Sequence, residues 1–207
     1  VQALFESLLR VGDTGRAVEV LSQAEKRGTQ VRSLRMQLLN LLARQENWEV
    51  MDREINSILS KNPSEDDYLL VISSFRYVRQ PMMASRYLQR ALRDFPESPA
   101  LREQEASLLV EVGDYENAEK KLADLITKHP DNAMLHVLRI FMLEQTNRQS
   151  AIRGSIEEAW QKCPGHAAIA ALRVQSMLKD GRGDDALKFA EKARQDHPDL
   201  PEPRYLV

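Results

Sequence analysis

The chain has 207 residues, of which 43% are hydrophobic and 29% are charged, a composition too apolar for an intrinsically disordered protein. Only 8 residues are glycine and 6% are aromatic, which argues against an all-β fold, whereas the strong helix formers Ala, Leu, Glu, Lys, Arg and Gln dominate. The net charge of −2 argues against a dedicated nucleic-acid-binding protein, and no apolar run approaches the roughly 20 residues that span a bilayer. The lone Cys163 excludes an internal disulfide.

Prolines recur at a nearly constant interval along the chain. Five of them are separated by 33, 34, 34 and 34 residues, and each closes a similar phrase such as LRDFP or ITKHP: Pro63, Pro96, Pro130, Pro164 and Pro198. A fixed period of this length indicates a repeated supersecondary unit. Because proline cannot continue a helix, each of these residues is predicted to mark the end of a unit.

In chain order, the period predicts six units, at about 1–31, 32–64, 65–98, 99–132, 133–166 and 167–200, and the start of a seventh at 201–207. The second half of a unit carries small or apolar residues at i, i+4 and i+7, which form one face of a helix. These stripes are Ala17, Leu21, Ala24; Met51, Ile55, Ile58; Ala84, Leu88, Ala91; Ala118, Leu122, Leu125; and Ala186, Ala190, Ala193. A short turn and another apolar helix, such as LRMQLLNLLAR or LREQEASLLVEV, precede each stripe. We therefore predict an all-α fold of stacked helical hairpins that share a core.

The repeated unit resembles the tetratricopeptide repeat (TPR) family. In the best copy, Pro99–Asn132, the family's signature positions hold Gly113, Tyr115, Ala118 and Pro130. The resemblance covers the whole chain. It implies a single right-handed α-solenoid over residues 1–207, built from about six TPR hairpins.

The first helix of each unit departs from the family pattern. Its aromatic position holds Val1, Arg35, Tyr68, Arg102, His136 and Ala170, and its small-residue position often holds a large one, as in Phe5, Leu39, Ile72, Ile140 and Val174. These departures bear on the crossing angles and the superhelical pitch rather than on the solenoid itself.

The sequence contains no credible catalytic, cofactor or metal site. The charged residues of GDYENAEKKLADLITKHP, Gly113–Pro130, lie at helix ends, where they complement the helix dipole. The pair in CPGH, Cys163–His166, has no second pair at metal-ligand spacing, and GRGDD, Gly181–Asp185, lacks the Lys-Ser/Thr of a phosphate-binding loop. Glu157 and Glu158 are adjacent on a helix and point in different directions, so we expect surface charge rather than a catalytic dyad. We predict a protein that is not an enzyme and holds no cofactor and no metal.

The remaining candidate is a surface. In TPR proteins the first helices line the concave face, where partners commonly bind, so the resemblance implies a groove on these helices. Its residues are Arg10, Met36, Asn40, Arg44, Leu69, Ser73, Arg76 and Tyr77 in the first half, and Glu103, Ser107, Glu111, Val137, Phe141 and Glu144 in the second. Further equivalent positions hold Gln2, Glu6, Val110, Ala171, Gln175, Leu178 and Lys179. A row of arginines (Arg10, Arg44, Arg76) suits carboxylates, and the second half is more acidic and apolar. Such a mixed groove suits an extended or helical protein segment. The alternative is that these residues form ordinary solvated helix faces.

The resemblance implies a non-catalytic scaffold that docks a partner protein or peptide on its concave face, with no nucleic acid and no membrane insertion. The repeats also resemble the TPR regions of bacterial exopolysaccharide export proteins, including Pel-like ones, which implies a polysaccharide-modifying enzyme as partner and a periplasmic rather than a cytoplasmic location. Because the chain begins at Val1 and ends in PEPRYLV, we expect it to be part of a longer protein. Two alternatives stay open: a regulatory or substrate-selecting arm of an enzyme whose catalytic domain lies outside this chain, and a cytoplasmic adaptor or chaperone.

Overall fold

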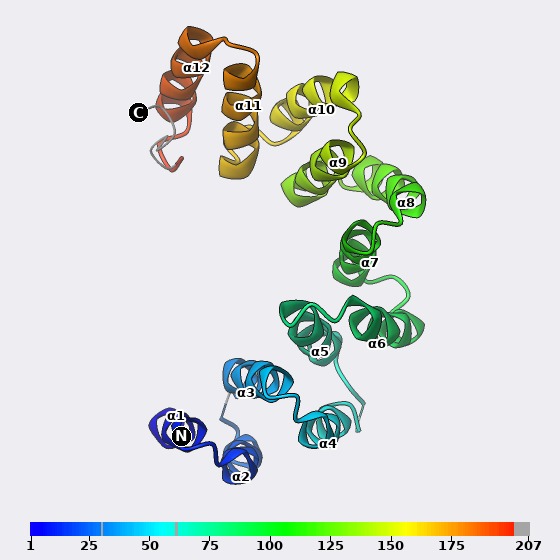
Figure 1. Ribbon diagram of the computed structural model, residues 1–207, viewed down its shortest axis with the longest axis vertical. Helices are drawn as coiled ribbons and strands as arrows, with labels where there is room; N and C mark the ends of the chain where they lie inside the picture. The colour runs from blue at the N-terminus through cyan, green and yellow to red at the C-terminus, as the bar shows by residue number, and fades with distance from the viewer. Residues whose placement is uncertain (30, 61, 201–207) are drawn as a thin grey trace. The chain divides into compact units, whose positions relative to one another are not determined.

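The computed structural model describes residues 1–29, 31–60 and 62–200, so the predicted start of a seventh unit at 201–207 lies outside the described residues. Within them the chain forms twelve α-helices and no strand (Figure 1), which confirms the predicted all-α fold. The helices are α1 (Gln2–Arg10), α2 (Thr14–Lys26), α3 (Arg32–Arg44), α4 (Trp48–Ile58), α5 (Glu65–Tyr77), α6 (Pro81–Asp94), α7 (Pro99–Glu111), α8 (Tyr115–Lys128), α9 (Ala133–Gln145), α10 (Gln149–Lys162), α11 (Ala167–Lys179) and α12 (Gly183–Asp196).

The helices form stacked hairpins, as predicted. Within hairpins α1 packs on α2, α3 on α4, α5 on α6, α9 on α10 and α11 on α12, and α3 also packs on α5 of the next hairpin. The chain divides into two compact units, Val1–Leu108 (unit 1) and Leu109–Val207 (unit 2). The single domain over residues 1–207 and the right-handed superhelix stay predictions.

Local sequence signals explain where the helices begin and turn. Asp13, Asn47, Asp114 and Asn132 are N-caps whose side chains accept hydrogen bonds from backbone N–H groups of the first turn. In the turn between the two helices of every hairpin, one residue at an equivalent place has a left-handed backbone with φ between 54° and 81°. This residue is either glycine or polar: Gly12, Glu46, Arg79, Gly113, Asn147 and Gly181. The tight turn therefore recurs in all six hairpins even where the glycine is missing.

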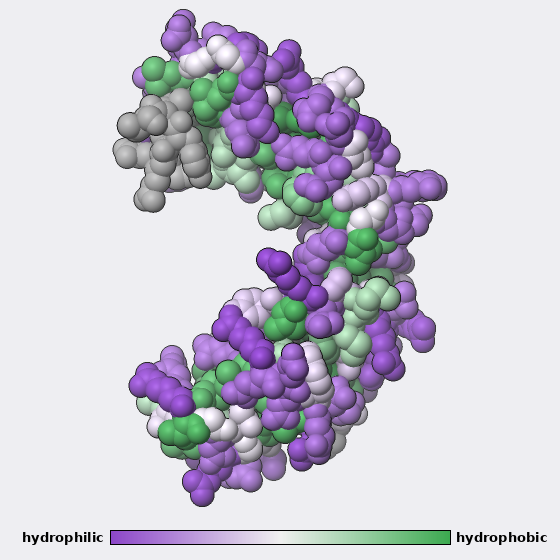
Figure 2. Space-filling model, viewed as in Figure 1, coloured by the Kyte–Doolittle hydropathy of each residue, from purple (hydrophilic) through white to green (hydrophobic). Residues whose placement is uncertain are grey.

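The core follows the predicted stripes of the second helices. All of their members are buried, as Ala17, Leu21 and Ala24 illustrate with exposed fractions of 0%, 0% and 3%. Large first-helix residues fill the space that these small residues leave, including Phe5, Leu39 and Ile72. The outer surface is largely hydrophilic, with smaller hydrophobic areas among the polar side chains (Figure 2).

Two polar residues at the family's aromatic position, the buried His136 and the partly exposed Arg102, contact the backbone of the preceding turn. His136 is fully buried, and its Nε2 lies 2.8 Å from the carbonyl oxygen of Pro130. Arg102 donates from Nη2 to the carbonyl oxygen of Pro96 at 2.9 Å. Pro96 and Pro130 are the residues that close a unit, so both side chains satisfy the backbone carbonyl at the same place in successive repeats.

Candidate functional site

In unit 1 the structure brings four predicted groove residues together. Arg10, Asn40, Arg44 and Tyr77 line a pocket of about 380 Å³, together with Leu9, Gln37 and Leu41. Three of the four are the last residues of the first helices α1, α3 and α5, so the repeat period places them in register along this face. We call this the arginine pocket.

The arginine pocket is cationic and contains no carboxylate among its lining residues. The guanidinium carbon of Arg44 lies 4.9 Å from the centroid of the Tyr77 ring, a cation–π contact that orients the arginine while its N–H groups stay available. Neither Arg10 nor Arg44 forms an ion pair within residues 1–29, 31–60 and 62–200. Asn40 has its Oδ1 atom buried with no hydrogen-bond partner. Two positive charges and an unsatisfied amide therefore face one hollow.

The third arginine of the predicted row lies in a different environment. Arg76 donates to Gln104 Oε1 and, over 2.8 Å, to Ser107 Oγ, both on α7. Arg76 and the predicted Ser107 are thus joined by a hydrogen bond, but Arg76 does not line the arginine pocket. The row of three predicted from the sequence is divided between these two places.

The other predicted positions range from exposed to buried. Met36 and Leu69 are partly buried against the core of unit 1, Ser73 and Glu103 are half-buried, and Glu111 is exposed. The equivalent position Val110 is only 3% exposed, so its side chain is not available to a partner.

In unit 2 the predicted residues gather around an apolar pocket of about 560 Å³. Its walls come from α9 and α11, and no charged side chain lines it: Val137, Ala168, Ala171, Leu172, Val174, Gln175 and Leu178. On α9, Met134 and Phe141 are 60% and 45% exposed and flank Val137 at helical spacing. We call this surface the apolar pocket; exposed apolar area of this kind is typical of an interaction site.

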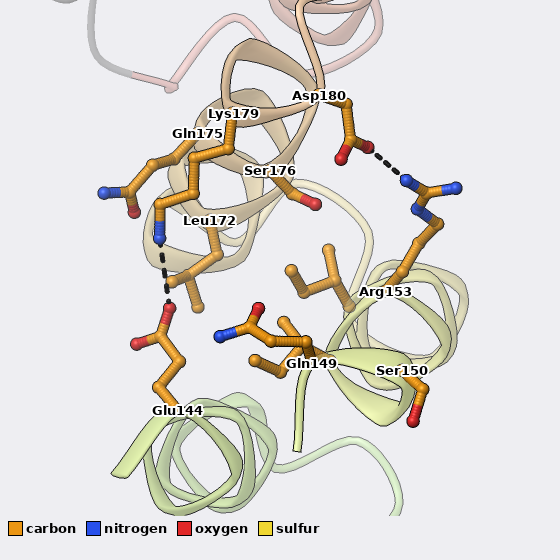
Figure 3. Close-up of a pocket in the computed structure, with 11 residues that line it drawn as sticks. Glu144, Gln149, Ser150, Arg153, Leu172, Gln175, Ser176, Lys179 and Asp180 are labelled. Carbon is orange, nitrogen blue, oxygen red and sulfur yellow. Dashed lines mark hydrogen bonds and ion pairs between the residues drawn. The ribbon is translucent and has the colours of Figure 1, made fainter. Parts of the chain in front are cut away.

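A second pocket of unit 2, of about 420 Å³, shares Leu172 and Gln175 with the apolar pocket (Figure 3). Two ion pairs flank it: Glu144 with Lys179 at 3.5 Å, and Arg153 with Asp180. The predicted residue Glu144 therefore faces a polar pocket that adjoins the apolar one. The sequence interpretation missed Arg153, Leu172 and Ser176, although Leu172 and Ser176 neighbour Ala171 and Gln175 on the same helix.

The candidates for chemistry have structural roles instead. Glu157 pairs with Arg173 and Glu158 with Arg139, each at 2.6 Å, so the two carboxylates do point in different directions. Burial raises the pKa of the Cys163 thiol, which disfavours the reactive thiolate. No group of three or more potential ligands is placed to hold a metal ion in the described parts of the chain.

No helix among the described residues combines the length and the apolar character that crossing a bilayer requires.

Comparison with known proteins agrees with this geometry. A tetratricopeptide repeat family model matches residues 72–133. The match and the fold support the TPR family. Over 133 residues, or 64% of its length, the chain is 28% identical to a TPR repeat-containing protein of Pseudomonas aeruginosa, and it spans only 22% of that protein.

Solved structures show the same fold at low sequence identity. A tetratricopeptide repeat protein from Parabacteroides merdae has a TM-score of 0.61 and 18% identity, over 93% of this chain and 76% of that one. The structure of Pseudomonas aeruginosa pilF has a TM-score of 0.57 and 17% identity, over 80% of this chain and 76% of that one. PilW, described as a type IV pilus biogenesis factor, has a TM-score of 0.57 and 13% identity, over 81% and 78%.

Proposed function

We propose that this chain is a non-catalytic scaffold that binds a partner protein or peptide on the faces formed by its first helices. TPR proteins act as protein-interaction scaffolds, and the family model that matches here describes a repeat rather than a catalytic domain. The observation that carries the proposal is the arginine pocket, where Arg10 and Arg44 face a hollow without a carboxylate to neutralise them. The groove residues predicted from the sequence, apart from the buried Val110, are the proposed contacts of the scaffold with its partner.

The arginine pocket suits a carboxylate of the partner. A guanidinium can donate two parallel hydrogen bonds to a carboxylate, and Arg44 is held in orientation by Tyr77. Asn40 also lines the hollow, and its side-chain Nδ2 group can donate a further hydrogen bond to the carboxylate. In unit 2, the apolar pocket suits an aliphatic or aromatic side chain of a partner, because its lining carries no charge that would have to be desolvated.

Charge reversal tests the arginine pocket. A synthetic peptide array carrying acidic and neutral peptides supplies binders, and their affinity for the wild type is compared with that for Arg10→Glu/Arg44→Glu. Binding to acidic peptides should fall at least about tenfold, because a like charge then faces the ligand. Arg44→Glu/Arg76→Glu should also weaken capture through the loss of Arg44, but it should melt below the wild type because Arg76 donates two hydrogen bonds to α7.

The matched control is Arg16→Glu/Arg53→Glu, which reverses two exposed arginines on second helices. These residues pair with Asp13 and Glu49 and lie outside the pocket, so this variant should bind like the wild type. Equal loss in both double variants would mean that only net charge matters, and undiminished binding by Arg10→Glu/Arg44→Glu would refute the proposed site.

For the biological setting, we propose a bacterial exopolysaccharide export complex in the periplasm, with a polysaccharide-modifying enzyme as the docked partner. The resemblance of the repeats to such export proteins supports this, and the relative from Pseudomonas aeruginosa is also bacterial. Copurification of the chain with polysaccharide-modifying enzymes of the same organism should succeed for the wild type and fail for Arg10→Glu/Arg44→Glu.

A second setting is an adaptor in a pilus-assembly complex, which the fold shared with the pilus biogenesis factor PilW favours. Copurification with pilus-assembly proteins, and not with polysaccharide-modifying enzymes, would favour this alternative.

A further inference from the structure

The outer side of α6 carries a row of arginines. The buried side of this helix consists of Ala84, Leu88 and Ala91, which pack into the core of unit 1. The opposite side is exposed and holds residues spaced by about one helical turn, and we call it the arginine stripe: Arg79 in the preceding turn, then Met82, Arg86, Arg90 and Arg93. Met82 is 75% exposed at the start of this stripe.

The arginine stripe differs from the equivalent surface of every other second helix. At the positions that correspond to Met82, Arg86, Gln89, Arg90 and Arg93, each of the other five helices carries at least one carboxylate. These carboxylates include Glu19 in α2, Glu49 in α4, Glu116 in α8, Glu158 in α10 and Asp184 in α12. Mixed signs are what a solvated helix face ordinarily has, so the single sign at these five positions of α6, which leave out the exposed Asp94 at its end, needs another explanation.

The ion pairs of the described residues also leave out the four arginines of the stripe. None of them forms an ion pair with a carboxylate in the part of the chain that the structure describes. Arg90 lies over the Tyr68 ring, with its guanidinium carbon 5.8 Å from the ring centroid. The nearby Asp94 accepts a hydrogen bond from the Tyr68 hydroxyl instead. The stripe thus concentrates positive charge on a protein whose formal net charge is −2.

We propose that the arginine stripe binds an acidic segment of a partner protein, with carboxylates spaced by about one helical turn. Every positively charged residue of this surface is arginine, whose planar guanidinium matches a carboxylate through two parallel hydrogen bonds. The inference is independent of the first-helix pockets, because α6 is a second helix and supplies no residue to them.

The composition of the stripe favours a protein over the other polyanions. Protein interfaces are enriched in Arg and Met and depleted in Lys, Glu and Asp, which is the pattern found here. A membrane-binding helix presents a broad apolar face to the lipid, but the apolar face of α6 is buried in the core and Met82 stands alone outside.

The test uses a fluorescein-labelled peptide of roughly four helical turns, with glutamates one turn apart and neutral residues between them. Fluorescence anisotropy at roughly 150 mM salt measures its affinity for the whole chain. We expect Arg86→Glu/Arg93→Glu to weaken binding at least about tenfold, since two attractive contacts become repulsive. Replacing Arg86, Arg90 and Arg93 by lysine should also weaken it several-fold, because lysine cannot donate the paired hydrogen bonds.

The matched control is Lys120→Glu/Lys128→Glu, which reverses two charges on α8, the second helix of the next repeat. Lys120 and Lys128 pair with Glu116 and Asp124, so this variant should lose less than about twofold. If Arg86→Glu/Arg93→Glu loses helical content, Arg86→Gln/Arg93→Gln replaces it, with several-fold weaker binding expected. Equal losses in stripe and control variants, no binding of the peptide, or tighter binding of duplex DNA or anionic phospholipid vesicles than of the peptide would each overturn the proposal.

Discussion

A buried ion pair in the second hairpin provides the sharpest test of how this fold is held together. The Arg35 and Glu54 side chains are 9% and 3% exposed, with Nε and Oε1 3.3 Å apart. These two atoms lack hydrogen-bond geometry, so the pair is held by charge alone at this contact. Arg35 has a second partner, because its Nη2 lies 2.9 Å from Oε2 of the half-exposed Glu25.

Removing Arg35 should lower the free energy of unfolding more than removing Glu54. Arg35→Met leaves Glu54 buried without a cation, so we expect a loss of about 3–5 kcal/mol in the free energy of unfolding at neutral pH. Glu54→Leu leaves Arg35 with Glu25, so a smaller loss of about 1–3 kcal/mol is expected. In Arg35→Met/Glu54→Leu neither buried charge remains, and the double variant should lie within about 1 kcal/mol of the wild type or be more stable.

The cost of Arg35→Met should also depend on pH. Burial raises the pKa of Glu54 from the ordinary 4.5, whereas Arg35 lowers it, so removing Arg35 leaves the rise unopposed. A carboxyl group whose pKa is higher in the folded state stabilises the fold most below its unfolded pKa, and this stability is lost as the pH rises through the folded pKa. The destabilisation by Arg35→Met should therefore be largest at neutral pH and shrink towards about pH 5.

The wild type, the two single variants and the double variant form a double-mutant cycle. Urea denaturation followed by circular dichroism, at about pH 7.5 and about pH 5, measures the stability of all four proteins. The reasoning would be refuted by a pH-independent Arg35→Met, or by a double variant as unstable as the sum of the single ones. Either result would mean that the packing of the aliphatic stems, and not the charges, determines the effect.

Substitutions at Ala118 and at two glycines test the packing of unit 2. Ala118→Trp should overpack a fully buried position and lower the free energy of unfolding by roughly 1–3 kcal/mol, measured in the same denaturation assay; an unchanged midpoint would contradict the assignment of the small-residue face. Gly113→Ala and Gly165→Ala both strain a left-handed residue at a cost of about 1–2 kcal/mol, but only the second places a Cβ 2.6 Å from His197 Nδ1. Gly165→Ala should therefore melt lower than Gly113→Ala, and His197→Ala should reduce the difference between them.

Much of the candidate site could be located from the sequence, because the repeat period determines which residues share one face of the stacked helices. Once the period is known, equivalent positions on successive first helices must lie on one face, and this places Arg10, Arg44 and Tyr77 together. The period does not tell which arginines are already engaged. Arg76 lies one residue before the equivalent position, which Tyr77 holds, and its guanidinium is hydrogen-bonded to α7.

The arginine stripe of α6 shows a second limit of prediction from the sequence. In the sequence, a run of charged residues on a second helix cannot be told from an ordinary solvated surface, and the family resemblance implies binding by the first helices instead. Among the described residues, only the lack of ion pairs at Arg86 and Arg93, which depends on packing between helices, separates this surface from the ordinary ones.

The amino-acid sequence by itself determined the helices, their turns and the buried stripes. These depend on contacts within a few residues, such as the Asp114 cap of α8 and the spacing of Ala118, Leu122 and Leu125. Only the tertiary structure determined which polar residues of the first helices are buried and which are exposed, because a charge can be buried only where another part of the chain compensates it. Arg35 lies inside because Glu25 and Glu54 pair with it there, whereas Arg10 and Arg44 have no carboxylate partner among the described residues and line an open pocket.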